Sequence, residues 1–283
     1  MTEGFQTREY WERRLRDHFS LEGVGYLRLG RRYNEWMYRV RGEVFDRVAD
    51  GLDEQTESRA DGTRSRSGAL RVLDVGSGTG FYVDRWLRRS AEVTGVDLTD
   101  VAVDGLRRRF PGVRFLQADI GDPLGPPLAS EVGTFDVVSA FDVLFHIVDD
   151  AQYARALGNI ASLLRPGGVF LWSDNFIHQP TIRVAHQVSR SLPEVEAALA
   201  GAGLEVVARR PMFVLMNYPA DTESKLARLA WTAMVSPAMV SDHLGGLLGA
   251  LLYRVERRLV AGRGESPSTE VMICRRRDEG GTT

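Results

Sequence analysis

The sequence predicts an α/β fold in which a mainly parallel sheet is covered by helices on both faces. From residue 69 onward, short apolar runs alternate with segments of helical periodicity, and a glycine-rich turn follows the first apolar run. The composition agrees, because 283 residues that are 43% hydrophobic and 26% charged can bury a full core. We therefore expect one main domain with additions.

Seven segments have the character of strands, and strands separated by helices favour parallel pairing. The predicted strands are 70–75, 92–97, 113–118, 135–140, 168–173, 204–215 and 269–274. The predicted core helices are 82–89, 101–110, 152–164 and 192–202. We expect the last strand to return beside the sixth, with the helical segment 221–260, broken at Pro237, inserted between these two strands.

The N-terminal 50 residues have the spacing of two helices. Their aromatic side chains, which include Tyr10, Tyr26, Tyr33 and Trp36, either pack on the sheet or form a lid over a ligand. The predicted organisation is an N-terminal helical lid (1–50), a flexible linker (51–68), a core (69–275) with the helical insertion 221–260, and a disordered tail (276–283).

Charge, cysteine content and hydropathy limit the classes of binding partner that we expect. The net charge of -2 provides no overall positive field for nucleic acid. Cys274 is the single cysteine, and with five scattered histidines it offers no metal-ligand spacing, so we expect no metal site. The longest apolar run, 244–253, is too short to cross a bilayer, and no secretory signal is visible. We expect a cytoplasmic protein with no membrane partner.

A glycine-rich turn after the first strand predicts a cofactor loop. Gly76, Gly78 and Gly80 alternate there, and glycine allows positive φ and close approach of backbone N–H groups to a nucleotide-like ligand. Dinucleotide-binding loops usually have the spacing G-x-G-x-x-G, which differs from the spacing here. Asp74, which precedes the loop, is unfavourable beside a pyrophosphate and suits a cofactor with a cationic amine.

These residues resemble the class I S-adenosylmethionine-dependent methyltransferases, whose first motif, Asp-x-Gly-x-Gly-x-Gly, is matched by Asp74 to Gly80. The segments 135–138 and 164–168 look like the fourth and fifth motifs of that family. The resemblance implies a Rossmann-like class I methyltransferase fold and S-adenosyl-L-methionine as cofactor, with S-adenosyl-L-homocysteine as product.

The resemblance also implies roles for single residues. Asp97 is expected to accept hydrogen bonds from both ribose hydroxyls, and Asp119 to contact the adenine amine, with Ile120 against the ring. The alternatives are a turn or helix cap for Asp97 and an ordinary turn for Asp119. The full predicted cofactor set is Asp74, Gly76, Ser77, Gly78, Thr79, Gly80, Asp97, Leu98, Asp119, Ile120, Phe141 and Tyr33.

Family members transfer the methyl group by in-line attack on the sulfonium methyl carbon, so the protein mainly aligns the acceptor and, for some acceptors, removes a proton. His146 is the predicted general base, and the alternative is a histidine that braces the loop after the fourth strand. Phe141 and Asp142 match positions that line the methionine moiety or the acceptor entrance. His178 and His186 are weaker candidates for an acceptor pocket.

The predicted partner is a small organic acceptor methylated at O, N or C. We expect its pocket to include Trp231, Met234, Met239, Leu247 and Leu251; alternatively, these side chains pack on each other or on the partner of a homodimer. Two other functions stay open. Arginine clusters are compatible with an RNA or protein methyltransferase, and the fold also permits a protein that binds the cofactor without transferring a methyl group.

Overall fold

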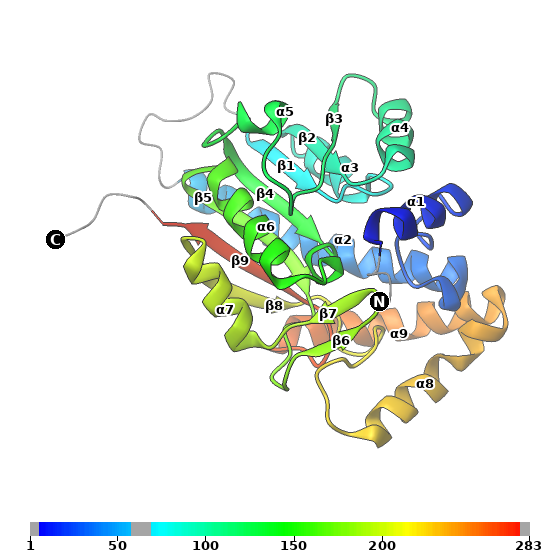
Figure 1. Ribbon diagram of the computed structural model, residues 1–283. Coiled ribbons are helices and arrows are strands. Elements are labelled where there is room, and N and C mark those ends of the chain that lie inside the picture. The colour runs from blue at the N-terminus through cyan, green and yellow to red at the C-terminus, as the bar shows by residue number, and fades with distance from the viewer. Residues whose placement is uncertain (1–5, 58–68, 278–283) are drawn as a thin grey trace, which may run out of the picture.

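One seven-stranded sheet organises the chain in a computed structural model that describes residues 6–57 and 69–277 (Figure 1). The strand order is β3-β2-β1-β4-β5-β9-β8. β1 to β5 pair in parallel, and β9 is antiparallel to both of its neighbours. The strands are β1 (Arg71–Val75), β2 (Glu92–Asp97), β3 (Arg114–Gln117), β4 (Phe135–Phe141), β5 (Leu164–Asp174), β8 (Leu204–Pro211) and β9 (Glu270–Arg276).

This sheet confirms the predicted fold class and the return of the last strand beside the sixth. β1 is central and buried on both faces, as its apolar side chains require. β1, β2 and β4 are adjacent and parallel, so their carboxyl ends meet at one edge of the sheet. Ligands bind at this edge in open α/β sheets.

Helices cover both faces of the sheet and produce two hydrophobic clusters. One cluster contains side chains of the N-terminal helices, of α3, α4 and of the C-terminal insertion. The other contains side chains of α5, α6 and α7. These core helices are α3 (Phe81–Arg88), α4 (Asp100–Arg109), α5 (Pro126–Ala129), α6 (Asp150–Leu163) and α7 (Leu192–Gly201).

Two N-terminal helices are present, as predicted: α1 (Thr7–Asp17) and α2 (Gly30–Glu57), with the short 3-10 helix η1 (Leu27–Leu29) between them. The predicted linker 51–68 is wrong at its beginning, because residues 51–57 continue α2. Leu52 is buried in the same cluster as Val48 and Ala49, so the packed face of α2 extends past residue 50. Residues 58–68 lie outside the described residues.

The C-terminal insertion consists of α8 (Lys225–Val240) and α9 (Asp242–Gly262). The predicted break at Pro237 is wrong, since α8 continues to Val240. Proline cannot donate to the carbonyl of Ala233, four residues earlier. The Ser236 hydroxyl donates to that carbonyl instead (2.9 Å), which allows the helix to pass the proline.

Two smaller details also differ from the predictions. Arg276 pairs with Leu204 in β9, so the predicted tail begins one residue too early; residues 278–283 lie outside the described residues. A hairpin of β6 (Ile182–Val184) and β7 (Gln187–Ser189) follows β5 and was not predicted. Strands of three residues are too short to show a periodic pattern.

Candidate cofactor site

The loop after β1 has the backbone geometry that its glycines predict. Gly76, Gly78 and Gly80 have φ values of 69°, 53° and 82°. A Cβ on Gly76 would lie 2.4 Å from Cγ2 of Val143. Glycine is therefore required at Gly76 both for its dihedral angle and for space.

Gly80 has a different role from the one predicted. It is the residue that precedes α3, and it does not line the pocket beside the loop. A Cβ there would lie 2.4 Å from the ring of Phe110. Gly80 therefore permits close packing of α3 against the segment after α4, and its predicted contact with a cofactor stays a prediction.

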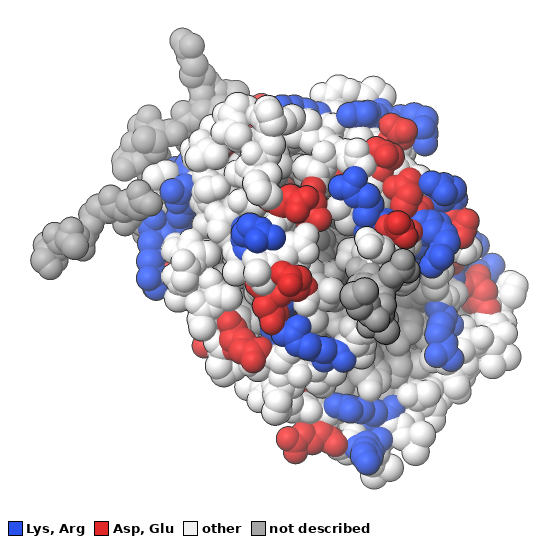
Figure 2. Space-filling model, in the orientation of Figure 1, with Lys and Arg blue, Asp and Glu red and all other residues white. Residues whose placement is uncertain are grey.

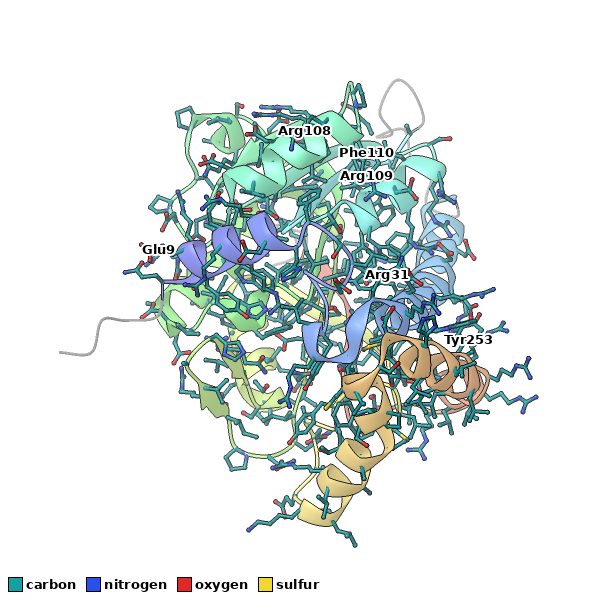
Figure 3. All side chains as sticks on the ribbon, turned by 90° about the vertical axis from the view of Figure 1, so that its right-hand side faces the viewer. Glu9, Arg31, Arg108, Arg109, Phe110 and Tyr253 are labelled. Carbon is teal, nitrogen blue, oxygen red and sulfur yellow. The ribbon has the colours of Figure 1, made fainter. Side chains whose placement is uncertain are left out.

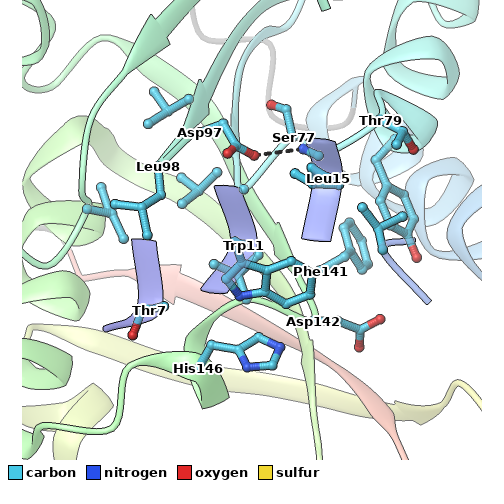
Figure 4. Close-up of a pocket in the computed structure, with 18 of the residues that line it drawn as sticks. Thr7, Trp11, Leu15, Ser77, Thr79, Asp97, Leu98, Phe141, Asp142 and His146 are labelled. Carbon is cyan, nitrogen blue, oxygen red and sulfur yellow. Dashed lines mark hydrogen bonds between the residues drawn. The ribbon is translucent and has the colours of Figure 1, made fainter. Parts of the chain in front are cut away.

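Asp97 is the last residue of β2, and its side chain holds the glycine loop that follows β1. Its Oδ2 accepts a hydrogen bond from the Gly78 N–H (2.9 Å), and its Oδ1 accepts from the N–H and the hydroxyl of Thr99 (2.9 and 2.8 Å) (Figure 4). Burial raises the pKa of this carboxyl. Three donors hold the carboxylate at the pocket wall, and the remaining lone pair, on Oδ2, is free for a ligand hydroxyl.

The pocket lies between this loop, the ends of β2 and β4, and helix α1 (Figure 4). The predicted residues that line it are Gly76, Ser77, Gly78, Thr79, Asp97, Leu98, Asp119, Ile120 and Phe141. Five further residues line the pocket and were not predicted as part of it: Trp11, Leu15, Val24, Tyr38 and Gln152. The first four belong to segments far from the motifs, and only the aromatic character of residues 1–50 indicated them.

Asp119 follows β3 with both carboxylate oxygens engaged. Its Oδ1 accepts from the Gly121 N–H (2.8 Å), as in the turn that was the alternative reading, and its Oδ2 accepts from Nε2 of Gln152 (3.2 Å). Buried Ile120 lies beside it in the pocket wall. A carboxylate next to an apolar surface suits an amine carried on a flat ring.

Asp74 does not line the pocket, and its predicted contact with a cationic amine stays a prediction. Its side chain faces β4, where it accepts a hydrogen bond from the Ser139 hydroxyl (2.7 Å), and Ser139 in turn accepts from Nε1 of Trp86 (3.1 Å). Asp74 is opposite Ser139 in the strand register, which explains the pairing. Burial raises the pKa of Asp74 to about 7.

Tyr33 is the third predicted cofactor residue that does not line the pocket. It is fully buried, and its hydroxyl donates to the carbonyl of Met216 (3.0 Å). Tyr38 lines the pocket instead. Five residues correspond to about 500° of helix rotation, so Tyr33 and Tyr38 face different sides of α2.

His146 lies in the short helix η2 (Leu144–His146) after β4 and lines the pocket. Its Nδ1 lies 2.9 Å from the carbonyl oxygen of His186, in the hairpin turn. A carbonyl only accepts, so Nδ1 carries the proton and Nε2 has a free lone pair. Burial lowers the pKa of His146 to about 4, which keeps the imidazole neutral. Trp11 packs edge-on against the ring at 4.9 Å.

Asp142 forms the pocket wall next to Phe141 and has a left-handed backbone, with φ of 58°. Such a conformation is strained outside glycine and needs support from its surroundings. Ser173 gives this support, because its hydroxyl donates to Oδ1 (2.8 Å) and accepts from the Asp142 N–H (3.0 Å). The buried guanidinium of Arg41 pairs with the other carboxylate oxygen.

The predicted acceptor pocket in the insertion is not formed. Trp231 is buried in the core, and Leu247 and Leu251 are 71% and 65% exposed. Met234 and Met239 pack against the core cluster. The insertion packs along α2 instead of over the pocket, so α1 and the loop containing Val24 supply the apolar cover.

His178 lies away from the pocket, where its Nδ1 is 2.6 Å from Oδ2 of Asp221. His186 contributes its carbonyl to His146 and stacks on Tyr10 at 5.9 Å. Within residues 6–57 and 69–277, no group of three or more His, Cys, Asp or Glu side chains has metal-binding geometry.

The fold and this site define a Rossmann-like methyltransferase. The residues present fit S-adenosylmethionine: the glycine loop lines the pocket, Oδ2 of Asp97 has one unused lone pair, and Asp119 lies against Ile120. A family model described as "Methyltransferase domain" matches residues 72–168, which contain both carboxylates and the loop.

Similar proteins of known name are also methyltransferases. A ubiquinone biosynthesis O-methyltransferase of Paracidovorax citrulli is 32% identical over 213 residues, which are 73% of this chain and 76% of that protein. Proteins of the same name from Albidiferax ferrireducens and Marinobacter nauticus are 34% and 29% identical, over 36% and 62% of this chain. In these two the match spans only 40% and 61% of the relative's length.

Among solved structures, a putative sarcosine dimethylglycine methyltransferase from Galdieria sulphuraria has the same fold, with a TM-score of 0.51 and 13% identity over 83% of this chain and 86% of that one. The chain belongs to the class I S-adenosylmethionine-dependent methyltransferase family, and S-adenosylmethionine is its cofactor.

Proposed function

We propose that this chain transfers a methyl group from S-adenosylmethionine to a hydroxyl oxygen of a small organic acceptor. The observation that carries the proposal is His146, whose Nε2 lone pair belongs to a side chain in the same pocket as Asp97 and the glycine loop. The relatives named as O-methyltransferases support oxygen as the accepting atom.

Bound S-adenosylmethionine supplies a methyl group that is already activated by the sulfonium charge. Asp97 would hold the ribose hydroxyls and Asp119 the adenine amine. His146 would take the proton from the acceptor hydroxyl at Nε2, while the carbonyl of His186 holds the ring orientation through Nδ1. Trp11 and Leu15 from α1 exclude water from this space, and their apolar surfaces favour an acceptor with an apolar body.

The experiment is an assay for S-adenosylhomocysteine by mass spectrometry, with matched acceptors that carry a hydroxyl, an amine or neither. We expect turnover with hydroxylated compounds. His146→Ala should lower the rate by about 100-fold or more, which is the usual contribution of a general base. Cofactor affinity, measured by calorimetry, should stay within about twofold, because the cofactor contacts proposed above do not involve His146.

The assay also tests the alternatives. Cofactor binding without turnover on any acceptor would favour a protein that uses the cofactor in another way. An RNA or protein methyltransferase is less supported, because one of the three arginine clusters that suggested it pairs within the chain: Arg85, Arg88 and Arg89 with Asp46, Asp84 and Asp50. We keep a cytoplasmic location as part of the proposal, since the buried Cys274 needs no oxidising compartment.

A further inference from the structure

An apolar surface covers the outer sides of α8 and α9. Among the described residues, twelve large hydrophobic side chains are exposed, and seven of them lie on these two helices. The seven form the α8–α9 face: Leu226 (75% exposed), Leu229 (65%), Val240 (82%), Leu244 (46%), Leu247 (71%), Leu251 (65%) and Val255 (43%). The four on α9 repeat every three or four residues and therefore share one side of that helix.

The opposite sides of the same helices already pack on the protein. α8 buries Trp231, Val235 and Ala238, and α9 packs along α2, where Gly249 lies against Trp36. Both helices therefore have two apolar sides, and only one side of each packs against the rest of the protein. Figure 3 looks toward this side of the molecule, where α8 and α9 lie next to each other.

Cations outnumber anions on the two helices themselves, while exposed Glu223 precedes α8 and Glu43 of α2 pairs with Arg257 (2.7 Å). Lys225, Arg254, Arg257 and Arg258 are exposed. Asp242 and Glu256 are the acidic residues between 225 and 263; Glu256 is fully buried, and Asp242 pairs with Arg32. This local positive charge contrasts with the net charge of -2 of the whole chain. In Figure 2 much of the surface over α8 is white, with basic and acidic residues side by side at its lower end.

We propose that the α8–α9 face docks on an anionic lipid membrane, with both helices lying in the interface. An apolar side that carries Leu and Val, bordered by Arg and Lys, is the composition of helices that bind membrane surfaces. A second copy is a poorer occupant, because it would bring the same cations near each other. No helix in the described part of the chain is long and apolar enough to span a membrane, and lying on the surface requires no such length.

The test is flotation of the full chain with vesicles of phosphatidylcholine alone or with 30 mol% phosphatidylglycerol, in low and high salt. We expect binding to the anionic vesicles that salt weakens. The double variant Leu229→Ser, Leu247→Ser should reduce the bound fraction about tenfold or more, because both leucines lose apolar contact with lipid. Arg254→Gln with Arg258→Gln should weaken binding about fivefold per arginine, on anionic vesicles only.

The matched controls change exposed residues on the rest of the surface: Val132→Ser with Val207→Ser for the leucines, and Arg108→Gln for the arginines. These variants should bind as the unchanged chain does. Failure of the unchanged chain to float with anionic vesicles would overturn the proposal, as would equal binding by the leucine variant. A concentration-dependent dimer in light scattering that the leucine variant abolishes, without vesicle binding, would assign the face to a second copy instead.

Discussion

At the scale of the residue, Asp97 holds the glycine loop and presents its carboxylate to the pocket at the same time. Asp97→Ala should weaken cofactor binding by about 1.5–3 kcal/mol, because hydrogen bonds to a charged group are lost. Isothermal titration calorimetry measures this. Asp97→Asn should lose less, since it keeps one oxygen acceptor, and Asp104→Ala, an exposed carboxylate on α4, should change nothing. An Asp97→Ala variant with unchanged affinity would contradict the assignment.

His146 predicts a dependence of stability on pH. Its pKa is about 4 in the folded chain and ordinarily 6.5, so the unfolded chain takes up a proton first as pH falls. The stability that neutral His146 contributes is complete above pH 6.5 and is lost as the pH falls through 4. We expect His146→Gln to be less sensitive to acid by about 2 kcal/mol between pH 7 and 5. Urea unfolding at both pH values measures the difference; parallel losses would contradict it.

Site residues that are defined by the local sequence were predicted, whereas those defined by contacts between distant segments were not. The loop, Asp97 and Asp119 were found because each lies at or just after the carboxyl end of a strand, and these ends meet at one edge of a parallel sheet. Tyr33 was wrong and Tyr38 was missed because only packing decides which side of α2 faces the pocket. Gln152 reaches Asp119 across 33 residues, and no local pattern indicates such a pair.

At the scale of the element, Ser139 of β4 connects three elements by hydrogen bonds. Its hydroxyl accepts from Trp86 in α3 and donates to Asp74 in β1. Ser139→Ala should destabilise the fold by about 1–3 kcal/mol, because a buried N–H and a buried carboxyl lose their partner. Urea unfolding tests this, with the exposed Ser130→Ala as control. If both variants have the same unfolding midpoint, the chain of hydrogen bonds has no energetic role.

Helix α1 closes the pocket with few buried contacts. Leu15 is its one fully buried side chain, while Trp11 reaches the ring of His146. We expect Trp11→Ala to increase the rate of cofactor release about tenfold, since aromatic contacts and pocket cover are lost, with little change in the unfolding midpoint. Stopped-flow fluorescence measures release, and the exposed Arg13→Ala on the same helix is the control. An unchanged release rate would remove α1 from the role of a lid.

Periodicity predicted the elements well where each has one apolar face. It predicted them less well where a side chain compensates for a residue that normally ends a helix. β2 matches its predicted bounds, because its apolar run ends at a functional carboxylate. α8 passes Pro237 because Ser236 satisfies the carbonyl that proline leaves unpaired. Such a compensation depends on a rotamer, which the order of residues does not determine.

At the scale of the whole molecule, the insertion is joined to the sheet by a buried carboxylate. Glu256 of α9 is fully buried, and it accepts hydrogen bonds from the N–H groups of Val214 and Leu215 (2.7 and 2.9 Å), just after β8. The N–H groups of this bend thus have a side-chain partner instead of a strand. The α8–α9 pair is consequently coupled to the edge of the sheet by polar contacts as well as by packing.

This coupling predicts one cooperative unfolding transition for insertion and sheet together. Glu256→Ala leaves two buried N–H groups without partners and should cost about 2–4 kcal/mol, while Glu256→Gln, which keeps one acceptor oxygen, should cost less. The chain has five tryptophans, so the signal of Trp231 in α8 is taken as the fluorescence difference between the unchanged chain and Trp231→Phe. This signal and far-UV circular dichroism in urea should shift together. An early fluorescence transition with an unchanged circular dichroism midpoint would mean that α8 and α9 unfold independently of the sheet.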